Sequence, residues 1–115
     1  MKIERFEDII AWQKAKDLTT QIYTIFDSCK DYSFRDQIRR ASVSVMNNIA
    51  EGFERQTNKE FKNFLYISKG SCAEIRSMSD LAYELKYLSC KNKDLISAST
   101  IEISKILSGF IKTLR

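Results

Sequence analysis

Four polar residues recur along one predicted helix in a pattern that could form a chemical site: Arg40, Ser44, Asn48 and Glu51. Steps of four, four and three residues place them on one side of a helix. Such a ladder could be a binding or assembly site, or a hydrogen-bond network at the edge of the core. A single carboxylate beside an amide supplies no acid–base pair, and no nucleophile–base pair or glycine-rich phosphate loop accompanies it.

Histidine is absent from the chain. Its absence excludes Ser-His-Asp and Cys-His catalysis, and zinc or di-iron sites that need imidazole ligands. The sequence therefore predicts a non-enzymatic protein with no catalytic residue, metal ligand set or cofactor.

A second group of residues is basic: Arg35, Arg39, Arg40, Arg55, Lys59, Lys62 and Lys69. The better candidates for phosphate contacts among them are Arg35, Arg39, Arg55, Lys59 and Lys62. The first two are one helical turn apart, and the other three repeat at steps of four and three around a predicted helix junction. Residues 33–69 carry seven basic and four acidic groups, a net charge of +3, and the whole chain carries +4. Such a surface can bind a phosphate backbone with a strongly salt-dependent affinity. The alternative is a solvated face on which acidic residues alternate with the basic ones.

Aromatic residues form a third group, in which Tyr83 and Tyr87 are expected one turn apart on the same helix as Tyr66. Aromatic rings beside basic groups can stack on unpaired bases. They can equally close the edge of a bundle or an oligomer interface. Basic residues near the end of the chain suit the dipole of a final helix.

The elements that position these residues are predicted to be helices, because the chain has no Pro and only three Gly. Apolar residues recur at three- and four-residue steps, which predicts helices over residues 8–28, 33–56, 57–89 and 92–115. The expected N-terminal caps are Asp8, Ser33 with Asp36, Thr57 with Glu60, and residues 92–94. Gly52 is expected to help end the second helix, and Gly70 to allow close approach of a neighbouring helix. The predicted fold is an all-α, antiparallel up-down-up-down four-helix bundle, a single domain over residues 1–115.

The second predicted helix carries a second apolar set on another side, which includes Val43, Met46 and Phe53. The two apolar sets together cover roughly 200° of arc, whereas a surface helix of a monomer needs only somewhat more than about 100°. The excess predicts an oligomer interface at these three residues.

The cellular setting is expected to be the cytoplasm. The N-terminal residues lack the apolar region of a signal peptide, and no apolar run approaches the roughly 20 residues of a membrane span. The three cysteines are odd in number and form no C-x-x-C pair, which favours reduced thiols.

Three sequence blocks together resemble a known family: WQKA at residues 12–15, QIRRASVS at 37–44 and NIAEGF at 48–53. They are similar to the "four helix bundle protein" family, whose founding members are encoded in intervening sequences of bacterial 23S rRNA genes. The resemblance implies a homopentameric ring with a positively charged surface or channel. It also implies similarity to the diversity-generating retroelement accessory protein, which binds nucleic acid and a reverse transcriptase. Arg39, Arg40, Asn48 and Glu51 occupy signature positions of the family, and we interpret them mainly as determinants of fold and assembly.

These observations predict a homo-oligomeric protein that binds structured RNA or DNA through a basic surface, with no membrane partner. The alternative is a protein–protein adaptor, in which a ring of subunits recruits an acidic protein partner.

Overall fold

Four long helices account for most of the computed structural model, which describes residues 2–115. A short 3-10 turn, η1 (Phe6–Asp8), precedes them. The helices are α1 (Ile10–Ile25), α2 (Tyr32–Phe53), α3 (Asn58–Glu84) and α4 (Cys90–Thr113). No strand occurs in this part of the chain.

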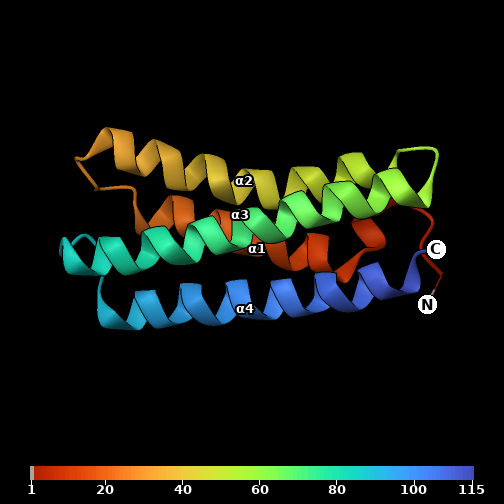
Figure 1. Ribbon diagram of the computed structural model, residues 1–115. Coiled ribbons are helices and arrows are strands. Elements are labelled where there is room, and N and C mark those ends of the chain that lie inside the picture. The colour runs from red at the N-terminus through yellow and green to blue at the C-terminus, as the bar shows by residue number, and fades with distance from the viewer. Residues whose placement is uncertain (1) are drawn as a thin grey trace.

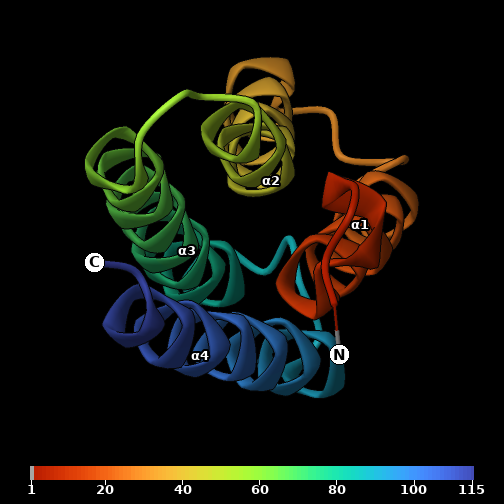
Figure 2. The same ribbon diagram turned by 90° about the vertical axis from the view of Figure 1, so that its right-hand side faces the viewer.

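The four helices lie side by side and follow one another around a common axis (Figures 1 and 2). Each helix packs against the next in the sequence, and α4 returns to pack against α1. The α1–α2 and α3–α4 connections lie at one end of the bundle, which we call the α1–α2 end (Figure 1). The α2–α3 connection lies at the opposite end, the α2–α3 end, near the last residues of the chain. The prediction of an all-α four-helix bundle is confirmed.

One apolar stripe from each helix fills the core, as the helical period of the sequence predicts. Residues from all four helices are fully buried, among them Ile22, Ile38, Leu65 and Leu107. Burial of such stripes provides most of the stability of helices that would be marginal in isolation.

Small side chains let α2 pack closely on α3. A Cβ atom built on Gly52 would lie 2.7 Å from the Cβ of Phe64 and 2.9 Å from a ring carbon of Phe61. About two turns further along the seam, Ser68 Oγ donates a hydrogen bond to the carbonyl of Val45 at 2.9 Å. The prediction that Gly70 allows a close helix approach is wrong within this chain, since nothing lies within 4 Å of its Cβ position. Gly52, rather than Gly70, is the glycine that allows a neighbouring helix to approach closely.

The caps at the first two helix starts differ from those expected. Asp8 does not cap α1, because its carboxylate instead accepts from the backbone N–H groups of Glu4 and Arg5. At α2 the cap is Asp31, whose carboxylate accepts from the N–H of Phe34 at 3.2 Å, and the helix begins before Ser33.

Of the two caps predicted for the later helices, the cap of α3 is confirmed and the cap of α4 is wrong. Thr57 caps α3 as predicted, with its hydroxyl oxygen accepting from the N–H of Glu60 at 3.1 Å. Ser89 caps α4 in place of residues 92–94, accepting from the N–H of Asn92. α3 ends at Glu84, earlier than predicted, because Lys86 takes a left-handed conformation with φ of 65° that no α-helix can contain.

Among residues 2–115, no helix combines the length and the apolar character that a membrane span requires.

Candidate functional site

The polar ladder of α2 divides into separate contacts. Asn48 Nδ2 donates to Ser44 Oγ at 2.9 Å, and Ser44 Oγ shares a hydrogen bond of 2.9 Å with Ser71 Oγ of α3. Arg40 and Glu51 stand about 16 Å apart along the helix and do not contact each other. Arg40 donates to Gln37 Oε1 at 3.0 Å instead, and Glu51 is exposed. Ser44 and Asn48, the two central residues of the ladder, therefore have a structural role: their hydrogen bonds help to hold α2 against α3.

The predicted phosphate-binding residues lie in two groups near opposite ends of the bundle. Arg35 and Arg39 are in the first turns of α2, near the α1–α2 end, whereas Arg55, Lys59 and Lys62 surround the α2–α3 connection. Eighteen residues of helix separate Arg35 from Phe53, a length of about 27 Å. The five residues therefore do not form one continuous patch.

The first group is engaged within the protein. Arg35 pairs with Asp36 at 3.2 Å, and its guanidinium lies 4.8 Å from the ring centroid of Tyr32. Arg39 Nη2 donates to the carbonyl of Tyr23 in α1 at 2.9 Å, and its guanidinium lies 4.5 Å from that residue's ring. Arg39 Nε is buried without a hydrogen-bond partner. Arg39 thus ties α2 to α1, and its charge is only partly available to a ligand.

The second group is free of ion pairs. Among residues 2–115, no carboxylate lies within ion-pair distance of Arg55, Lys59 or Lys62. Arg55 and Lys59 are exposed, and Lys62 is half-buried. The Arg55 guanidinium rests 4.8 Å from the ring centroid of Phe64, which orients it at the surface. These three cations can meet an anionic ligand without first breaking an ion pair.

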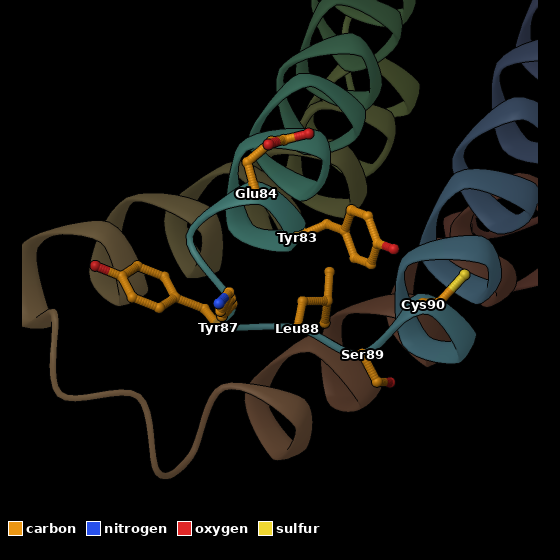
Figure 3. A pocket seen from close by; sticks show the side chains of 7 residues that line it. Tyr83, Glu84, Tyr87, Leu88, Ser89 and Cys90 are labelled. Atoms are coloured by element: carbon orange, nitrogen blue, oxygen red, sulfur yellow. The ribbon is translucent and has the colours of Figure 1, made fainter.

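The predicted pairing of Tyr83 and Tyr87 on one helical turn is wrong, because α3 ends between them. Both residues border an open pocket of about 490 Å³ at the α3–α4 connection, and the Tyr87 ring points away from the Tyr83 ring (Figure 3). Tyr87 Oη donates to Asp31 Oδ2 at 2.9 Å, a bond that raises the pKa of Tyr87. The Tyr83 ring lies 5.2 Å from Lys93 Nζ. These contacts close the α1–α2 end of the bundle and leave no paired stacking platform.

The residues expected to form an oligomer interface are half-buried within the subunit. Met46 and Phe53 pack against the subunit's own core, and the Phe53 ring meets Phe61 edge-on at 6.0 Å. Val43 is also half-buried. Larger exposed apolar side chains occur on the outward side of α3, where Ile67 is 51% and Leu81 50% exposed.

All three cysteines are free thiols, as predicted. Burial raises the pKa of the Cys72 thiol to about 11. Cys29 is half-buried, and Cys90 is exposed. The described residues include no cluster of three or more potential metal ligands.

Comparison with known proteins identifies a matching family and a similar crystal structure. The family model of the 23S rRNA-intervening sequence protein matches residues 7–109. The chain is also similar to a crystal structure from Bacteroides thetaiotaomicron, described as a protein with unknown function from the S23 ribosomal protein family. The TM-score is 0.83 at 24% sequence identity, over 90% of this chain and 99% of the other, and the likeness shows a shared fold. No curated protein matches the sequence. Because the family model covers nearly the whole bundle, the chain belongs to the 23S rRNA-intervening sequence protein family.

Proposed function

We propose that this chain is a non-enzymatic, homo-oligomeric protein of the cytoplasm that binds structured RNA or DNA through phosphate contacts. The observation that carries the proposal is the group of three cations without ion pairs, Arg55, Lys59 and Lys62, around the α2–α3 connection. Positive groups that have no ion pair within the protein bind phosphates with little reorganisation. The family's description links its members to rRNA genes and favours RNA as the ligand.

Self-association is the second part of the proposal. The outward side of α3 exposes Ile67 and Leu81, with the small residues Gly70 and Ser77 between them. Small residues let a second helix approach closely, and exposed apolar side chains then gain from burial. A neighbouring copy of the chain is the partner that we propose for this face, and the resemblance to a pentameric family favours a ring.

The alternative function is that of a protein–protein adaptor. The surface near the α1–α2 end favours it, because Tyr23 and Tyr32 are exposed there and each stacks on an arginine. Tyrosine and arginine are the side chains most enriched at the centres of protein interfaces. An adaptor would retain a protein partner while showing little affinity for nucleic acid at any salt concentration.

Charge reversal at the three free cations tests the proposal. The variant R55E/K59E/K62E is expected to bind a labelled structured RNA at least about tenfold more weakly than the natural protein at ~0.1 M salt. Its thermal unfolding should change little, because the three side chains form no ion pair. The matched control K16E/K30E/K91E changes the net charge equally at exposed positions elsewhere and should retain most of the affinity. Unchanged affinity in the first variant would remove these residues from the binding site.

A further inference from the structure

A row of basic residues runs along α3 from Lys62 toward the other end of the helix. Lys62, Lys69 and Arg76 follow one another at steps of seven residues. Seven residues are nearly two full helical turns, so the three side chains lie on almost the same side, about 10 Å apart from one to the next.

This side of α3 faces α4. Lys69 Nζ donates to Ser108 Oγ of α4 at 2.6 Å, which fixes the row along the groove between the two helices. Ser104, one turn before Ser108, is half-buried on the same side of α4. Lys112, one turn after Ser108 on nearly the same side, and Lys105, further round on the outer surface of α4, are exposed. The groove and its outer edge on α4 therefore carry amines, a guanidinium and hydroxyl groups, all of which can donate hydrogen bonds to phosphate oxygens.

Carboxylates are missing from the segments that form most of this groove. Residues 61–73 of α3 and residues 103–115 at the end of the chain contain no Asp or Glu. Three acidic groups border these segments and each is engaged: Glu74 accepts from Gln37 of α2, Glu102 pairs with Lys14 of α1, and Asp80, one turn beyond Arg76 on the same side of α3, pairs with Lys93 of α4. Within the described chain, none of the five basic residues of the groove has an ion pair.

An uncompensated row of like charges costs free energy in the unbound protein through mutual repulsion, and a bound polyanion relieves that repulsion. The opposite arrangement occurs near the α1–α2 end, where Lys93 pairs with Asp80 at 3.2 Å and Arg35 with Asp36. Because Asp80 and Lys93 belong to α3 and α4, the contrast distinguishes the stretch of the groove from Lys62 to Arg76 from its own end near the α1–α2 end, where the charges are paired.

We infer that the α3·α4 groove is a track for the phosphate backbone of a nucleic acid, formed by Lys62, Lys69, Arg76, Lys105 and Lys112. This inference rests on the proposed function and extends its site, since Lys62 belongs to both groups. The row from Lys62 to Arg76 is about 21 Å long, a distance over which one strand of a duplex presents roughly six phosphates. Lysine, arginine and serine along a track contact phosphates rather than base edges, so the binding is independent of base sequence.

The test compares three proteins on a labelled 20-base-pair RNA duplex and on a second duplex of scrambled sequence. The groove variant is K69Q/R76Q/K105Q, and the matched control is K16Q/K30Q/K91Q, which removes three exposed charges from other surfaces. A rescue variant, K69R/R76K/K105R, keeps every charge. Titrations between ~50 and ~200 mM salt give the affinity and its dependence on salt for each protein.

The groove variant is expected to bind both duplexes at least about tenfold more weakly, with a log–log salt slope shallower by about 2 to 3. The control and the rescue variant should bind like the natural protein. Equal losses in groove variant and control, or no loss in the groove variant, would overturn the inference and leave the proposed function standing. If the natural protein itself fails to bind either duplex, the proposed function falls and the inference falls with it.

Discussion

Replacement of Gly52 by alanine is expected to destabilise the protein by about 1 to 3 kcal/mol. The added methyl carbon would lie 2.7 Å from the Cβ of Phe64 and 3.3 Å from the backbone oxygen of Phe61. A Cβ atom and a backbone oxygen cannot rotate out of the way, so α2 and α3 would have to move apart and loosen their seam. The loss occurs although alanine is intrinsically the better helix former by about 1 kcal/mol.

Gly109→Ala is the matched control, because Gly109 is also helical and nothing lies within 4 Å of its Cβ position. This variant should be more stable than the natural protein by up to about 1 kcal/mol, since alanine loses less backbone entropy in a helix. Urea unfolding followed by circular dichroism measures both differences. A Gly52→Ala protein as stable as the natural one would contradict the close packing of α2 on α3.

The second large effect concerns assembly. The variant I67D/L81D is expected to convert the oligomer into a monomer of about 13.4 kDa, as measured by light scattering at micromolar concentration. The two side chains are half-exposed in the isolated subunit, so two charges there can remain solvated in a monomer. The same charges buried between two subunits would be unpaired, and unpaired buried charges are strongly unfavourable.

Ile10→Asp serves as the control, since Ile10 is 49% exposed and lies at the start of α1. It should leave the mass of the assembly unchanged. A natural protein that is already monomeric at micromolar concentration would contradict the proposed self-association. An oligomer that survives in I67D/L81D would contradict the assignment of the interface to α3.

Much of this fold could be predicted from the sequence because the relevant signals are local. The spacing of Ile38, Val45 and Ile49 predicts both that the segment is a helix and which side of it is buried. All three residues are fully buried in the structure. Thr57 with Glu60 forms the predicted cap, since the capping box is contained in four consecutive residues. The end of α3 could not be predicted from its composition, because it depends on the left-handed conformation of a lysine, a residue with no marked preference for it.

The candidate site was predictable only in part. Arg39 is one turn from Arg35 in the sequence pattern, but its partner Tyr23 belongs to another helix, and no local signal joins the two. Tyr87 likewise packs on Phe34 and donates to Asp31, contacts that only the assembled bundle brings together. The heptad spacing of Lys62, Lys69 and Arg76 was visible in the sequence. Its meaning required knowing that this side of α3 faces α4, whose segment from residue 103 onward contains no carboxylate.

Titration of the natural protein against labelled structured RNA and duplex DNA, at ~50 and ~200 mM salt, tests the central claim of phosphate binding most directly. The account predicts binding at the lower salt concentration that weakens steeply at the higher one, with a log–log slope of about −3 or steeper. Absence of binding at the lower salt concentration would contradict it. The basic surfaces would then be solvated faces, and the adaptor function would become the leading explanation.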